Sequence, residues 1–294
     1  MKKTLSSAIA LVIATGFGTQ AVAHNHGAES PHAAHAEKSR TDMIEYFKAK
    51  HPNRPFEDYI HGIYGYNAER KSQWEAQEEF APYDEYVDRG RDLFEKDKAA
   101  YVGCLVNSEK GVEYIRPSYP YFNEDTQAVV TLEGDINRCR TEAGLKPFNW
   151  RRGDIAHVSG FLGYESRGHK INVVINSEGA KQAFAAGERE FIEPRGQLGL
   201  ACASCHVYNA SRQARSDILS PALGHVTHFP VWRGKWSRGG AVDGLGTLHR
   251  RYEGCHRNMR SVPKEVQGEE YRNMEFFQAY ISNGLEINAP SYRQ

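Results

Sequence analysis

The segment Cys202-Ala203-Ser204-Cys205-His206 decides how the rest of the chain is interpreted, because it has the C-x-x-C-H pattern of covalent haem attachment. Two thiols at this spacing can both reach the vinyl groups of one haem, and the adjoining imidazole can bind the iron. A thioredoxin-like redox pair would need a βαβ context, and a zinc site would need a second set of ligands. We therefore predict one covalently bound haem c at Cys202 and Cys205, with His206 as an axial ligand.

The stretch that leads into this motif has a counterpart earlier in the chain. In each copy a glycine is followed four residues later by a phenylalanine and then by a cysteine, 14 or 15 residues after the glycine: Gly90, Phe94 and Cys104; Gly187, Phe191 and Cys202. A proline also follows eight residues after both Cys139 and Cys255. We interpret these repeated spacings as evidence of an internal duplication. Chance similarity between short helical segments is the alternative.

The first copy lacks the residues that hold haem. Asn107 and Ser108 stand where the second copy has Cys205 and His206. The first copy keeps Cys104 and Cys139, which we predict to form a disulfide in an oxidising compartment. Closing a loop of this length stabilises a domain by about 3 to 4 kcal/mol in the chain-entropy model.

The patterns predict a mainly α-helical fold with two domains. Helical patterns cover residues 86–104 and 184–202, and Ser177 is expected to cap the helix that opens the second domain. The best short strand candidate is the segment 169–176. We place a haem-free domain at residues 45–176 and a haem-binding domain at residues 177–294.

The chain begins in the manner of an exported protein. Two lysines precede a short apolar run and small residues follow at 21–23, so residues 1–23 are predicted to be a signal peptide that is removed on export to the periplasm. Residues 24–44 are polar and rich in histidine and alanine, and we expect a flexible tail. A free amine with His24 and His26 could bind a square-planar metal ion, with a solvated leader as the simpler interpretation. No later stretch is long and apolar enough to cross a membrane.

Composition is that of an ordinary globular protein. The 294 residues include 37 Lys and Arg against 37 Asp and Glu, and 40% are hydrophobic. This balance of charge gives no support for nucleic-acid binding.

Pairing of the other cysteines leaves Cys255 as a free thiol. It lies 49 residues after His206, within the range where small cytochromes supply a second axial ligand, as do Met259 and Met274. A thioether suits a simple electron carrier, whereas a thiolate lowers the reduction potential, so spacing alone leaves the choice open. Seven cations and two acids occupy residues 233–260, and cations promote ionisation of a thiol: Arg233, Lys235, Arg238, Arg250, Arg251, Arg257 and Arg260. A basic face that docks a partner is the other interpretation.

Three motifs resemble the SoxA subunits of SoxAX cytochromes, which act in bacterial thiosulfate oxidation. They are GQLGLACASCH at 196–206, RRYEGC at 250–255 and SNGLEINAPSYR at 282–293. The resemblance implies two cytochrome c-like domains related by a pseudo-twofold axis, of which the first has lost its haem. It also implies that His206 and Cys255 are the axial iron ligands, that Cys255 is often a persulfide, and that Arg251 binds the anionic substrate.

The reaction implied by the resemblance is that of an L-cysteine S-thiosulfotransferase. Thiosulfate is joined oxidatively to a cysteine of the SoxYZ carrier protein, and two electrons leave through haem. The implied partners are a SoxX cytochrome subunit in a heterodimer and a downstream cytochrome c. The alternative that the residues leave open is an electron-transfer cytochrome with His206 and a methionine on iron and no substrate chemistry of its own.

Overall fold

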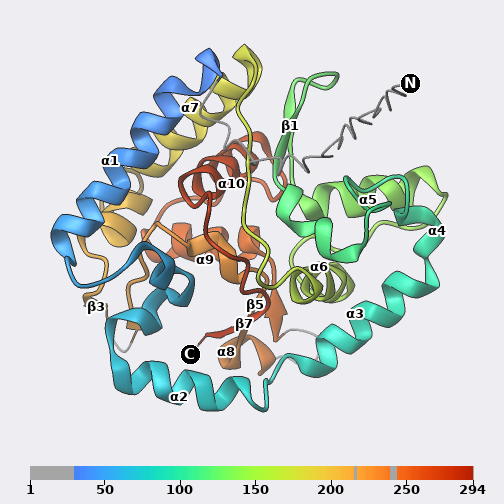
Figure 1. Cartoon of the computed structure of the whole chain (residues 1–294), viewed down its shortest axis with the longest axis horizontal. Coiled ribbons are helices and arrows are strands. Elements are labelled where there is room, and N and C mark those ends of the chain that lie inside the picture. Colours follow the sequence, from blue (N-terminus) through green and yellow to red (C-terminus); the bar gives the residue numbers. More distant parts are fainter. Residues whose placement is uncertain (1–29, 215–216, 239–243, 294) are drawn as a thin grey trace, which may run out of the picture.

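The computed structural model describes residues 30–214, 217–238 and 244–293, and the described chain is mainly helical, as predicted (Figure 1). The predicted signal peptide and the His24 to His26 segment lie outside the described residues. The helices before residue 177 are α1 (Ala34–Lys50), α2 (Ala68–Glu78), α3 (Asp84–Lys96), α4 (Lys98–Tyr101), α5 (Leu132–Glu142) and α6 (Asp154–Glu165). Those after it are α7 (Glu178–Ile192), α8 (Gly234–Ser237), α9 (Leu248–Asn258) and α10 (Glu269–Ile281).

Short helical turns and strands connect these helices. The turns of 3-10 type are η1 (Pro31–Ala33), η2 (Phe56–Tyr66), η3 (Val112–Tyr114), η4 (Arg116–Ser118) and η6 (His225–His228), and η5 (Ser204–Tyr208) is a π-helical turn. The strands form the hairpins β1 (Tyr121–Asn123) with β2 (Ala128–Val130) and β3 (Gln213–Ala214) with β4 (Asp217–Ile218). A three-stranded sheet has the order β6-β5-β7, from β5 (Val231–Arg233), β6 (Leu245–Gly246) and β7 (Ser291–Arg293).

Helix α1 corrects one prediction from the sequence. Residues 34–44 are not a flexible tail, because they form most of α1, which packs against α7 and α10. Ala33 and Ala36 are buried, and Glu188 of α7 accepts a hydrogen bond from Ser39 at 2.6 Å. Alanine favours helices and lets them approach closely, but it contributes little hydrophobic periodicity, so the pattern was missed. Residues 45–50, which we assigned to the first domain, also belong to this helix.

Two helix pairs cross at a glycine, one pair in each half of the chain. A Cβ atom on Gly187 of α7 would lie 1.9 Å from the carbonyl oxygen of Asn273 in α10, and one on Gly90 of α3 would lie 2.0 Å from that of His157 in α6. Only glycine allows backbones to approach this closely. The phenylalanine one turn later packs in the same way in both pairs: Phe191 contacts Phe277, and Phe94 contacts Phe161. These matched crossings support the internal duplication.

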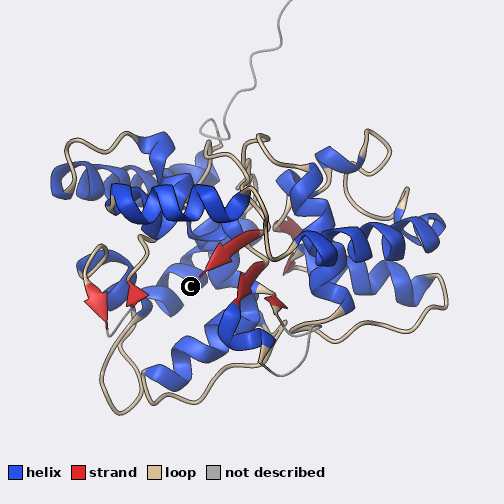
Figure 2. Ribbon diagram, turned by 90° about the horizontal axis from the view of Figure 1, so that it is seen from below, coloured by secondary structure: helices blue, strands red, loops and turns tan. Residues whose placement is uncertain are grey.

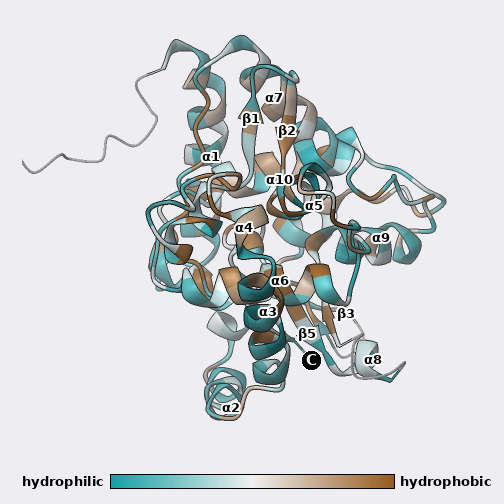
Figure 3. Cartoon of the chain, turned by 90° about the vertical axis from the view of Figure 1, so that its right-hand side faces the viewer, coloured by the Kyte–Doolittle hydropathy of each residue, from teal (hydrophilic) through white to brown (hydrophobic). Residues whose placement is uncertain are grey.

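Each helix pair has its own hydrophobic core, and the β6-β5-β7 sheet lies between them. Aromatic side chains of α7 and α10 dominate one core, and those of α3 and α6 dominate the other. Figure 2 shows the sheet between two groups of helices, and Figure 3 shows apolar segments around β5 and α6 while α2 and α3 are mainly hydrophilic. Strand β5 therefore reaches both halves of the molecule.

The segment 169–176 is extended but is not the strand that we predicted. Its side chains alternate, with Ile171, Val173 and Ile175 buried. Its regular pairing is limited to one isolated bridge between Lys170 and Glu286, and the other hydrogen bonds to residues 283–287 are irregular. The expected helix start is confirmed, since Ser177 accepts a hydrogen bond from the amide of Ala180 at the beginning of α7.

The first half contains the disulfide expected from the sequence. Cys104 forms a disulfide bond with Cys139, and their Cα atoms are 5.9 Å apart. This bond connects the turn after α4 to α5. Helix α5 resembles α9, because each begins with leucine after a threonine and has a cysteine as its eighth residue, Cys139 or Cys255. Within the described part of the chain, none of the helices is long and apolar enough to span a bilayer.

Candidate functional site

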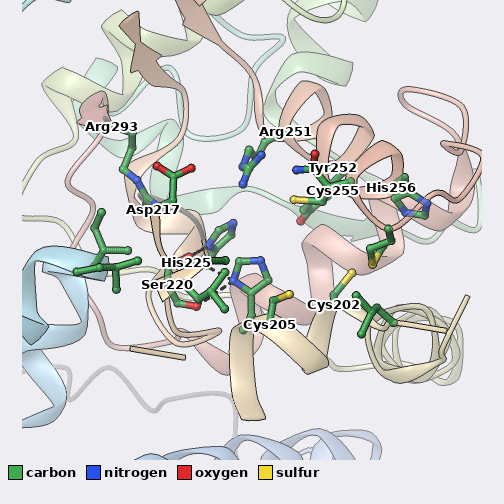
Figure 4. A pocket seen from close by; sticks show the side chains of 18 of the residues that line it. Cys202, Cys205, Asp217, Ser220, His225, Arg251, Tyr252, Cys255, His256 and Arg293 are labelled. Atoms are coloured by element: carbon green, nitrogen blue, oxygen red, sulfur yellow. Dashed lines mark hydrogen bonds between the residues drawn. The ribbon is translucent and has the colours of Figure 1, made fainter. Parts of the chain in front are cut away.

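A cavity of about 310 Å³ is lined by Cys202, Cys205 and His206 of the C-x-x-C-H motif. Its walls come from the η5 turn, the β3–β4 hairpin, strands β5 and β7, and helices α9 and α10. Figure 4 shows the three free thiols Cys202, Cys205 and Cys255 together on this cavity, with His225 and Ser220 opposite Cys255. The elements that form the site are far apart in sequence and meet only in the folded chain.

Both thiols of the motif point into this cavity. Burial, followed by the neighbouring Cys255, raises the pKa of Cys202 to about 12, and burial also raises the pKa of Cys205. Neither is therefore the low-pKa thiol of a redox pair. Two protonated thiols beside an apolar wall that includes Met274 and Tyr252 fit the vinyl side of a haem c.

His206 is oriented so that one ring nitrogen is left for a metal. Its Nδ1 donates a hydrogen bond to the carbonyl oxygen of Ser220 at 2.9 Å. That bond fixes the tautomer with its proton on Nδ1, so Nε2 presents a lone pair. The Ser220 hydroxyl also contacts Nδ1 of His225 at 3.1 Å, and the rings of His206 and His225 meet edge to face. An imidazole held in this way is a typical axial haem ligand.

Cys255 faces His206 from the opposite wall. Burial opposes ionisation of this thiol, but Arg251 one turn earlier in α9, the neighbouring His206 and the charge of Arg233 outweigh burial and lower its pKa to about 6. A thiol of this kind is largely thiolate at neutral pH, and it is a good iron ligand and a good nucleophile. Cys255 has both properties in a cavity that also holds cations.

The two methionines that the spacing left open differ in position. Met274 is fully buried and its sulfur lies 3.9 Å from that of Cys202, on the attachment side of the cavity. Met259 lies at the end of α9 and is also buried. All three sulfurs line the cavity, but His206 acts on the Cys255 thiol and helps to lower its pKa, which favours Cys255 over either methionine as the second ligand.

Only part of the predicted cationic segment reaches the site. Arg233, Lys235 and Arg251 line the cavity. Arg250 instead stacks over Trp236 at 4.2 Å, and Arg257 is exposed and pairs with Glu253 at 3.6 Å. The segment is therefore not one uniform basic face.

Sequence reasoning gave no role to three ionisable residues of the cavity, Asp217, His225 and Arg293. Arg293 enters because β7 pairs with β5, although the two strands are about 60 residues apart in sequence. The available signal was the SNGLEINAPSYR motif, which ends at this arginine. Asp217 and His225 lie in the segment after the haem motif, and nothing in their local sequence marks them.

Comparisons with known proteins identify the relatives of this chain. Residues 89–171 match the family model described as SoxA/TsdA, cytochrome c domain, so the match falls in the half without the C-x-x-C-H motif. The chain is 40% identical to the L-cysteine S-thiosulfotransferase subunit SoxA of Chlorobaculum tepidum, with all of both chains covered. It is 37% identical to that of Allochromatium vinosum, over 89% of this chain and 92% of the relative. The crystal structure of SoxXA from P. pantotrophus superposes with a TM-score of 0.61 and 27% identity, over 73% of this chain and 79% of the other.

Proposed function

The chain belongs to the SoxA family of L-cysteine S-thiosulfotransferase subunits, and from this premise we propose that Cys255 and Arg251 form the active site at which thiosulfate is joined to a carrier cysteine. The family is one of thiosulfate-oxidising SoxAX cytochromes with covalently bound haem c. One observation carries the proposal: a low-pKa thiol, a guanidinium and a haem-attachment motif line a single cavity.

Four residues would hold the haem. Cys202 and Cys205 would form the thioether bonds, and His206 and Cys255 would bind the iron. When bound, the haem accepts electrons from the site one at a time. Ser220 keeps His206 in the required tautomer, and α9 keeps Cys255 on the opposite side.

Arg251 binds the substrate, and Cys255 forms a covalent bond with it. Arg251 holds sulfonate oxygens of thiosulfate by charge-assisted hydrogen bonds, which brings the outer sulfur to the Cys255 thiolate. A sulfur–sulfur bond forms between them with the loss of two electrons, for which bound haem would supply the acceptor. The carrier thiol then loses its proton and attacks the transferred sulfur, so that the Cys255 thiolate leaves. The products are a cysteine S-thiosulfonate on the carrier, one proton and two electrons.

The proposed setting follows from the same family. A SoxX cytochrome is the heterodimeric partner, in keeping with the SoxXA neighbour. SoxYZ is the carrier, and a downstream cytochrome c takes the electrons. The periplasm is the proposed location, because covalent haem attachment and the disulfide Cys104–Cys139 both suit an oxidising compartment.

The two halves are proposed to be cytochrome c-like domains related by a pseudo-twofold axis, the first without haem. The matched glycine crossings and the similarity of α5 to α9 support this proposal. Its boundary stays near residue 176, directly before α7.

A turnover assay tests the proposal. The complex with its partner cytochrome is supplied with thiosulfate and carrier, and electron release and carrier mass are followed. We expect Cys255→Ala and Arg251→Gln to abolish or strongly reduce both, while Arg257→Gln, on the exposed side of the same helix, retains them. Full turnover by Cys255→Ala would show that the chain acts only as an electron carrier.

A further inference from the structure

The SNGLEINAPSYR motif ends at a side chain whose role the active-site proposal does not explain. Arg293 is the last residue of β7 and lies in register with Arg233 of the parallel strand β5. Register partners in a parallel pair point to the same face of the sheet, about 4.8 Å apart. The preceding partners, Trp232 and Tyr292, stack their rings on the other face. Both arginines therefore project from the same face, into the cavity that holds Cys255.

Two like charges at this position lower the stability of the fold, so folding does not explain why both are arginine. Cross-strand pairs of like charge destabilise a sheet, and here Arg233 is only 3% exposed. Burial, then Arg251 and Arg293, lower the pKa of Arg233 to about 10, and burial lowers the pKa of Arg293, with Arg251 acting in the same direction. Both stay protonated at neutral pH, so the fold tolerates a repulsion that hydrophobic side chains would avoid.

The surrounding charge does not cancel that of the pair. Arg251 and Lys235 line the same cavity, and Asp217 pairs with Arg233 at 3.7 Å. Figure 4 shows Arg293, Asp217 and Arg251 along one wall, on the side of the cavity away from Cys202. Four cations therefore face one carboxylate and the Cys255 thiolate among the described cavity residues.

We propose that Arg233 and Arg293 form, with Arg251, a binding site for the sulfonate end of a dianionic sulfur oxyanion. The proposal rests on the function proposed above and specifies how its substrate is held. Two parallel guanidinium groups can each donate paired hydrogen bonds to the oxygens of one tetrahedral group. Arg251 lines the same cavity, and its positive charge lowers the pKa values of Arg233, Arg293 and Cys255. The strand pair fixes the sulfonate, so the outer sulfur is directed to the thiol. Arg233 and Arg293 are positioning residues, whereas Cys255 carries the chemistry.

Steady-state kinetics of the haem-loaded complex tests this assignment. Arg293→Gln and Arg233→Gln should each raise KM for thiosulfate about tenfold or more and change kcat by less than about threefold, which is the signature of lost ground-state binding. Arg293→Lys should fall between them and wild type, because an ammonium keeps charge without the paired geometry. Arg257→Gln is the matched control and should keep the wild-type KM.

Sulfate binding gives a readout that does not need turnover. Sulfate should raise the Tm of the wild-type complex above its value in chloride of equal ionic strength, since a ligand of the native state stabilises it. Arg293→Gln should lose most of that increment, and Arg257→Gln should keep it. In chloride, Arg293→Gln should melt no lower than wild type, because one repelling charge is gone.

The outcomes separate the two proposals. An active wild type with unchanged KM and an unchanged sulfate increment in Arg293→Gln would overturn the arginine site and leave the active site intact. A wild type that binds sulfate through Arg293 but transfers no thiosulfate would support the anion site and refute the proposed reaction. A fall in Tm of Arg293→Gln in chloride, together with unchanged KM, would make the residue structural.

Discussion

The Cys255 thiol and the His206 imidazole line the same cavity, and His206 helps to lower the pKa of that thiol. Each is fixed by a separate element, His206 by its bond to the Ser220 carbonyl and Cys255 by helix α9. In the first half the corresponding cysteine, Cys139, is bonded to Cys104 instead. The same helical position thus serves a disulfide in one half and an iron-facing thiol in the other.

The glycine crossings predict a selective loss of stability. Gly187→Ala should lower the free energy of unfolding by about 3 kcal/mol or more, at or above the upper end for overpacking, because its Cβ would lie 1.9 Å from a backbone oxygen. Gly90→Ala should behave alike. Gly254→Ala in α9 is the control: its Cβ would meet nothing nearer than 3.6 Å, so helix propensity predicts no loss. Equal unfolding midpoints for all three in urea would contradict the close crossings.

The disulfide should contribute to stability and not to haem binding. Replacing both Cys104 and Cys139 with serine should lower the free energy of unfolding by about 3 to 4 kcal/mol, since the 35-residue loop is no longer closed in the unfolded chain. Haem content, read from the absorbance of the pyridine adduct, should not change. A loss of haem in proportion to the loss of stability would show instead that the two halves fold as one unit.

A buried carboxyl group between the halves predicts how stability depends on pH. Glu133 is buried, and burial together with Glu275 raises its pKa; its carboxylate accepts a hydrogen bond from Ser159 at 2.7 Å. The folded state then binds a proton more tightly than the unfolded state, so this group costs stability as pH rises above about 4.5. Glu133→Gln cannot ionise and should melt a few degrees higher than wild type at pH 7 to 8.

The same variant should show no gain near pH 4, where the wild-type carboxyl is protonated in both states. Glu79→Gln, at an exposed position, serves as control and should show no difference at either pH. A Glu133→Gln gain that is independent of pH would mean that the carboxyl is not the group responsible.

The sequence predicts features that depend on local chemistry and misses those that depend on assembly. The haem motif and the Ser177 cap were predictable because spacing and capping are local properties. The Cys104–Cys139 pair was predictable because these are the two thiols of the first copy. Arg293 was not, because its place in the cavity depends on a parallel strand pairing with β5. The first part of helix α1 was missed because residues 34–41 are polar or alanine, and only Ala36 among them is buried. The extended segment 169–176 resembles a strand in its alternating burial but lacks regular strand pairing.

The ligand opposite His206 is the point on which the whole account depends. Low-temperature EPR and near-infrared spectra of the ferric complex measure it directly, with Cys255→Met as the comparison. We predict the low-spin signal of histidine and thiolate ligation for wild type, and a methionine-to-iron charge-transfer band that is present only in Cys255→Met. A methionine band in the wild-type protein would contradict the account, because Met259 or Met274 would then hold the iron and Cys255 would not be its ligand.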